Sequence, residues 1–70
     1  MGSVDRFSRN LRAHRTEAGL SQERLAAICK LHRTEISLLE RGEREPRLST
    51  MIRLSRGLNV PVAALLEGID

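Results

Sequence analysis

Residues 21 to 40 contain two short helical patterns separated by a tight turn, and this pair constrains the fold more strongly than any other stretch. Ser21 is a favourable N-cap residue, and Glu23 lies in the first turn, where a negative charge favours the positive end of the helix dipole. A turn at residues 30 and 31 ends this helix. Its predicted inward residues are Leu25, Ala26, Ile28 and Cys29.

The second helix of the pair is predicted at about residues 33–40. Ile36 and Leu39 are spaced to face the core. His32 stands at the N-cap position, and Glu35 follows three residues later, where a capping box places its acidic residue. The residues left at the start and outer side of this helix are available for contacts outside the chain. This arrangement favours a DNA-reading element over a catalytic site.

Apolar residues at helical spacing predict three further helices, at about residues 5–18, 48–56 and 61–67. Ser3 or Asp5 is the candidate N-cap of the first of them, Gly19 ends it, and Pro61 suits the first turn of the last. No strand-like alternation lasts four residues, so the prediction is an all-α, compact five-helix bundle in one domain, residues 1–70. The other predicted inward residues are Val4, Phe7, Leu11, Ala18, Leu48, Met51, Leu54, Ser55, Leu58 and Val60.

The core of this bundle is predicted to be small and aliphatic. A chain of 70 residues leaves room for a single small core, and Phe7 is its one aromatic residue. Such a core is marginal in stability at this size, and burial against a second subunit would add to it.

Composition bounds the partners and the compartment. The formal net charge is +3, and all of the 12 basic residues except Lys30 are Arg, whose planar guanidinium suits phosphate and guanine edges. Cys29 is the single cysteine and cannot form an internal disulfide, which favours a reducing cytoplasm. The longest apolar run is far below the ~18 residues of a membrane span, and no signal-peptide pattern is present. A soluble cytoplasmic protein with no membrane partner is predicted.

Patterns of catalytic or metal-binding residues are missing from the sequence. His14 and His32 lie on different predicted helices, and no Cys/His spacing suits zinc. No Gly-rich phosphate loop is present either. The sequence therefore predicts no enzymatic activity, no metal and no cofactor.

Short motifs follow one another along the chain in a specific order and spacing. They are Leu11, Arg15, Gly19-Leu20-Ser21-Gln22, Leu25-Ala26, Ile36-Ser37, Glu40-Arg41-Gly42, Pro46, Leu58-Asn59-Val60 and Leu65-Leu66. In this order they resemble the XRE family of helix-turn-helix regulators, the phage repressor and Cro type, over residues 7–66. The resemblance implies a lambda-repressor-like DNA-binding domain with its motif at residues 21–40. Residues 31–37 are most similar to restriction–modification controller proteins, which usually carry tyrosine at the position of Glu35.

In such folds the second motif helix lies in the major groove, with its N-terminal residues against base edges. The candidate base-reading residues are therefore His32, Arg33, Thr34, Glu35, Ser37 and Leu38. Arg33 leads, because a bidentate Arg–guanine contact is the commonest specific one. Three roles are open to Glu35: it accepts from a cytosine amino group, caps the helix, or pairs with Arg33.

Other residues are candidates for contacts with the DNA backbone, which position the protein. They are Arg12, Arg15, Gln22, Arg41, Arg44 and Arg47. By resemblance, Gln22 grips a phosphate, and Glu40 holds Arg15 against another; a purely structural Arg15–Glu40 pair is the alternative. Arg44 and Arg47 could reach phosphates or a narrow minor groove.

Two positions depart from the family pattern. Lys30 stands where the family usually has Gly, which predicts a left-handed or strained backbone costing about 1–2 kcal/mol. Gly57 stands where the family usually has Ala, which predicts that the fourth helix frays early.

Members of this family pair across a two-fold axis and bind half-sites about one helical turn apart. The apolar residues near the C-terminal end exceed what one small core needs, so part of this stripe is predicted as the dimer face; the alternative is that all of it closes the monomer core. The residues concerned are Val60, Val62, Leu65, Leu66 and Ile69.

The predicted function is that of a homodimeric regulator that binds a (pseudo)palindromic operator in double-stranded DNA. A restriction–modification controller and a phage- or plasmid-type repressor both fit, and an activator would in addition contact RNA polymerase. The alternative from another class is an antitoxin-type protein-binding module that also represses its own operon.

Overall fold

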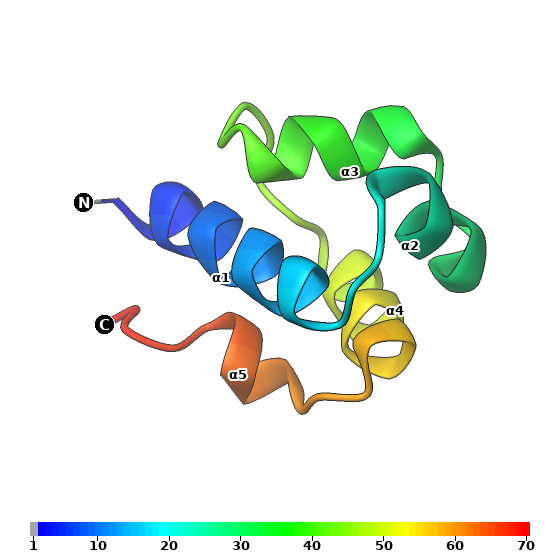
Figure 1. The fold of residues 1–70 in the computed structure, drawn as a ribbon. Coiled ribbons are helices and arrows are strands. Elements are labelled where there is room, and N and C mark those ends of the chain that lie inside the picture. Colours follow the sequence, from blue (N-terminus) through cyan, green and yellow to red (C-terminus); the bar gives the residue numbers. More distant parts are fainter. Residues whose placement is uncertain (1) are drawn as a thin grey trace.

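The computed structural model describes residues 2–70, and these form five α-helices with no strand among them (Figure 1). The all-α bundle predicted from the sequence is confirmed. The helices are α1 (Ser3–Glu17), α2 (Gln22–Cys29), α3 (Arg33–Glu40), α4 (Leu48–Leu58) and α5 (Val62–Leu65). Within the described residues, no helix has the length and apolar character that a membrane crossing requires.

The helix starts agree only in part with the predicted caps. Ser21 caps α2, since its Oγ accepts a hydrogen bond from the Arg24 amide at 3.0 Å. The prediction for α1 is wrong, because the helix starts earlier and Gly2 is its N-cap residue. The capping box on α3 is also wrong: His32 occupies the N-cap position, but no described side chain makes a capping bond there.

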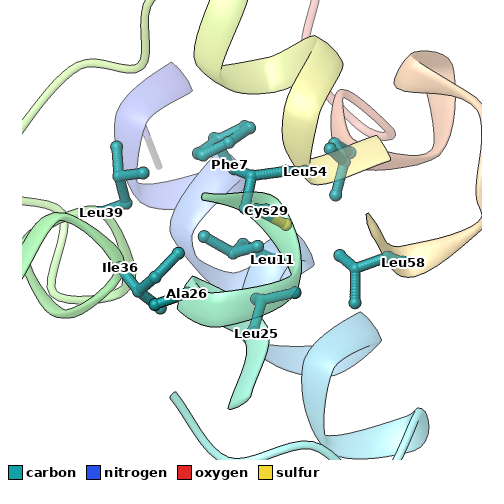
Figure 2. Packing of buried hydrophobic residues seen from close by; sticks show 10 residues of the cluster. Phe7, Leu11, Leu25, Ala26, Cys29, Ile36, Leu39, Leu54 and Leu58 are labelled. Carbon is teal, nitrogen blue, oxygen red and sulfur yellow. The ribbon is translucent and has the colours of Figure 1, made fainter. Parts of the chain in front are cut away.

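Most of the predicted inward residues form one core (Figure 2). Three predictions are wrong, namely Ala18, Ile28 and Leu48, which are exposed. Ala18 lies past the last turn of α1, Ile28 lies on the outer side of α2, and Leu48 begins α4 on a turn left uncovered by its neighbours. The buried cluster consists of Phe7, Leu11, Leu25, Ala26, Cys29, Ile36, Leu39, Leu54, Leu58 and Leu65.

Gly57 does not fray α4, contrary to the prediction, and the helix continues through it to Leu58. A Cβ atom at this position would lie 2.4 Å from Cys29 Sγ and 3.2 Å from Ile28 Cγ2. The missing side chain therefore lets the backbone of α4 approach the end of α2. Close packing explains this glycine.

The last helix, α5, is shorter than predicted, and Pro61 is its N-cap residue instead of lying in its first turn. It packs beside α1 and α4 (Figure 1). Asn10 Nδ2 of α1 donates to the carbonyl oxygens of Leu65 and Glu67, each at 2.9 Å. These bonds fix the C-terminal segment against the first helix.

Candidate nucleic-acid interface

A turn of three residues, 30–32, joins α2 to α3. Lys30 adopts the left-handed conformation, with φ 58° and ψ 44°, so the predicted conformation is confirmed. The Leu31 amide then donates to the Ala26 carbonyl at 2.9 Å, which ends α2 sharply. The result is a helix-turn-helix, with α3 along one edge of the molecule (Figure 1).

The start of α3 presents polar side chains to the surface. Ile36 and Leu39 are fully buried, as predicted, so the orientation of the helix is fixed. His32, Arg33 and Thr34 are exposed at its N-terminal end. Glu35, Ser37 and Leu38 are half-buried beside them. All six candidate base-reading residues therefore keep some surface on this part of the molecule.

Glu35 pairs with Arg44, and this ion pair differs from both intramolecular roles predicted for it. Arg44 Nη1 donates to Glu35 Oε1 at 2.5 Å. Arg33 instead lies near Glu23 on α2, with its Nε 3.5 Å from the carboxylate, and both side chains are more than half exposed. The predicted alternative of an Arg33–Glu35 pair is thus wrong.

The Glu40 carboxylate accepts hydrogen bonds from the side chains of two residues on neighbouring helices, Arg15 and Gln22. Arg15 contacts both carboxylate oxygens through Nε and Nη2, at 2.5 and 3.0 Å, and its Nη1 donates to the Leu20 carbonyl at 2.8 Å. Gln22 Nε2 donates to Glu40 Oε1 at 3.2 Å. The hydrogen bond with Glu40 raises the pKa of Arg15, partial burial opposes this, and the attraction of the carboxylate adds to it. The Arg15–Glu40 pair inferred from the sequence is present.

An open groove of about 750 Å³ lies between the start of α3, the following loop and α4. Four basic side chains line it, against two carboxylates, so its charge suits a polyanion. The lining residues are Lys30, Leu31, His32, Glu35, Arg44, Glu45, Arg47, Ser49, Thr50 and Arg53.

The remaining predicted backbone contacts lie outside this groove. Arg12 is exposed on α1. Arg41 is exposed at the end of α3, where its Nε lies 3.4 Å from the carboxylate of Glu43. The structure therefore brings Arg44 and Arg47 together with the start of α3.

A family model described as "Helix-turn-helix" matches residues 11–65. The chain belongs to this helix-turn-helix family. It is 49% identical over 60 residues to the control protein C.SmaI of Serratia marcescens, covering 86% of this chain and 71% of that protein. It is also 36% identical over 66 residues to the control protein C.MunI of a Mycoplasma species, covering 93% and 89% of the two chains.

A solved structure is similar to this helix-turn-helix protein over most of both chains. The restriction-modification controller protein C.AhdI from Aeromonas hydrophila superposes with a TM-score of 0.86 at 35% identity, covering 89% of this chain and 94% of that one. Family and relatives together make this chain a DNA-binding transcriptional regulator, as predicted. All three relatives are named control or controller proteins.

Sequence reasoning missed two basic residues that line the groove of the helix-turn-helix protein. Lys30 stands out in the sequence only through the backbone conformation expected there. Arg53 extends from α4, and its Nη1 donates to the Lys30 carbonyl at 3.2 Å. The spacing from Ser49 to Arg53, one helical turn, could have placed Arg53 on the same face as another groove residue.

The apolar residues that were predicted to include the dimer face differ in how far they are exposed. Leu65 is fully buried within the chain, so it belongs to the monomer core and its assignment to the dimer face is corrected. Val60 and Ile69 are partly buried against the same core. Val62 is half-buried, whereas Leu66 is 37% exposed. Leu66 offers the most exposed apolar side chain of the set.

Proposed function

We propose that this protein controls transcription of a restriction–modification system by binding, as a homodimer, to a pseudopalindromic operator. The proposal is carried by the exposed start of α3, held in place by buried Ile36 and Leu39 and flanked by a basic groove. The similarity to the controllers C.SmaI and C.AhdI supports the biological role.

Within this proposal α3 enters the major groove, and its first turn reads the bases. Arg33 is exposed and can present its guanidinium to a guanine edge in a bidentate contact. Its pairing with Glu23 is long and solvent-exposed, so water or DNA can replace the carboxylate at low cost. Thr34 and Ser37 add shorter hydrogen-bonding groups, while His32 and Leu38 border them.

Backbone contacts position the regulator on the duplex. Gln22 begins α2, where free amides favour an anion, and its side chain is held by Glu40. Arg47 lines the groove and has an exposed side chain for a phosphate. Arg12, Arg15 and Arg41 complete the proposed set, with Arg15 contributing mainly through the arrangement that it shares with Glu40.

The dimer contact is proposed at Leu66 and Val62, with the edges of Val60 and Ile69. A dimer doubles the contacts and explains why a half-site would recur about one helical turn away. If the regulator activates transcription, it also contacts RNA polymerase. The place of action is the bacterial cytoplasm.

The test begins by selecting bound duplexes from a randomised pool, for which a palindromic consensus is expected. Arg33→Ala is then expected to weaken binding to both duplexes. The loss of binding free energy should be about 1–3 kcal/mol larger for the selected duplex than for a scrambled one. Gln22→Ala is expected to weaken binding to both duplexes alike. Affinity of the wild-type chain should fall steeply with salt. Failure to select any sequence, or a flat salt response, would refute the proposed function.

A further inference from the structure

Glu35 and Arg44 connect the first turn of α3 to the loop that leads to α4. Their side chains are 21% and 53% exposed, respectively, and both line the groove at the start of α3. The loop turns sharply after α3 at Gly42, which has φ 69°, and this turn places Arg44 next to a residue nine positions earlier. The pair therefore lies on the surface that the proposed function assigns to DNA.

A lone carboxylate at this place would oppose binding, because the phosphates of DNA repel it. Pairing with Arg44 offsets that charge. One Arg44 nitrogen, Nη1, bonds Glu35, while a guanidinium carries five N–H donors. More than half of the side chain is exposed, so the remaining donors are available to another acceptor.

The carboxylate also restricts where this guanidinium can go. Without it, Arg44 would extend from an exposed loop and reach any nearby phosphate. With it, the guanidinium lies against the turn that contains Arg33 and Thr34. A guanidinium restrained at that turn lies beside the side chains that are proposed to read bases, and guanidinium groups are common donors to base edges.

We propose that Glu35 is a positioning residue that reads no base itself but holds Arg44 on the reading edge of α3, where Arg44 contacts a base and contributes to operator discrimination. This inference rests on the proposed function. It replaces the three roles that the sequence leaves open for Glu35 with one that acts through the loop.

A double-mutant cycle tests the inference. The probes are the duplex that the wild-type chain selects from a random pool and a scrambled duplex of equal length. Glu35→Ala and Arg44→Ala should each lower the ratio of the two affinities by about tenfold, and the double variant should lower it no further. Both single variants should relax the preference at the same base pair.

Several outcomes would overturn the inference. Additive losses would mean that Glu35 reads a base independently of Arg44. If Arg44→Ala loses the same affinity for both duplexes, Arg44 contacts a phosphate and no base. A gain on both duplexes for Glu35→Ala would make the carboxylate a simple repulsive charge. If the wild-type chain selects no sequence, the proposed function itself fails, which is a different result from any of these.

Glu43 provides a matched control. It lies in the same loop and pairs with Arg41 at 3.4 Å, so Glu43→Ala removes the same charge and leaves the Glu35–Arg44 pair intact. For Glu43→Ala, the ratio of the affinities for the selected and scrambled duplexes should equal that of the wild-type chain. A tenfold lower ratio would mean that the loss seen with Glu35→Ala comes from the charge change alone. Thermal unfolding checks that every variant is folded. Glu35→Gln, which preserves side-chain shape and a weaker hydrogen bond, should give an intermediate ratio, and a ratio below that of Glu35→Ala would contradict the positioning role.

Discussion

At the residue scale, Gly57 and Cys29 fit each other. A glycine inside a helix costs about 0.5–1 kcal/mol relative to alanine, because it loses more backbone freedom on folding. A Cβ atom on residue 57 would approach Cys29 Sγ to 2.4 Å, which explains why the position nevertheless suits glycine. The sequence signal was misleading because it concerned α4 alone, whereas the constraint comes from α2.

Gly57→Ala is expected to lower the free energy of unfolding by about 1–3 kcal/mol through overpacking. Cys29→Ala removes the sulfur that the new methyl group would meet. In that background the remaining close contact is with Ile28 Cγ2 at 3.2 Å, on an exposed side chain that can shift, so Gly57→Ala should cost much less than it does beside the sulfur. Urea denaturation of the two single variants and the double variant measures the coupling; additive effects would contradict the packing explanation.

The thiol of Cys29 is expected to be protected in the native state. It is 4% exposed, and burial raises its pKa, so the reactive thiolate is scarce at neutral pH. A thiol-specific reagent should therefore react slowly with the folded chain and rapidly in denaturant. Similar rates in the two conditions would show that the end of α2 opens readily. The raised pKa also predicts that stability falls as the pH rises above the ordinary thiol value of 9.0, because the unfolded thiol then loses its proton first.

At the scale of the element, local patterns predicted the presence and bounds of α2 and α3, although the inward position of Ile28 and the capping box on α3 were wrong. The cap at Ser21 and the buried positions Ile36 and Leu39 depend on residues within one or two turns of each other. The Glu35–Arg44 pair could not be predicted in this way, since its partners meet only after the loop has turned back. Leu48 was misassigned because periodicity shows which face a residue occupies, not whether another helix covers that turn.

The turn of the helix-turn-helix stores some strain at Lys30. A left-handed backbone costs an ordinary residue roughly 1–2 kcal/mol, whereas glycine adopts it freely. Lys30→Gly is therefore expected to raise the free energy of unfolding by up to about 1 kcal/mol. Asn59 has nearly the same conformation, with φ 57°. Because asparagine tolerates this conformation better than lysine, Asn59→Gly should raise the free energy of unfolding by less than Lys30→Gly does. Thermal unfolding compares the two; a larger gain at Asn59 would contradict the strain argument.

At the scale of the whole molecule, the C-terminal segment formed by α5 and the residue after it has a buried side and an exposed side. Leu65 is fully buried, while the adjacent Leu66 is 37% exposed. Asn10 fixes the segment by bonding two of its carbonyl oxygens. Sequence periodicity could identify the apolar stripe but could not separate its buried residues from its exposed ones, because burial there depends on how α5 packs against α1 and α4.

The difference in burial between Leu65 and Leu66 predicts that substitutions at the two positions affect different properties, the stability of the fold and the association of two chains. Leu65→Ala should destabilise the fold by about 2–5 kcal/mol, as expected for a large core residue. Leu66→Glu should leave the monomer folded but prevent the proposed dimer. Sedimentation at micromolar concentration, with Leu48→Glu as a control at an exposed leucine on α4, measures the association. A dimer that persists in Leu66→Glu would place the contact elsewhere.

The bonds of Arg15 and Gln22 to Glu40 also bear on the thermodynamics of DNA binding. They connect α1, the start of α2 and the end of α3 before any ligand arrives. Conformational entropy for arranging these helices has therefore already been lost on folding, so binding need not order them again. Calorimetry should accordingly record a change in heat capacity typical of two rigid surfaces meeting, without the large negative value that accompanies coupled folding.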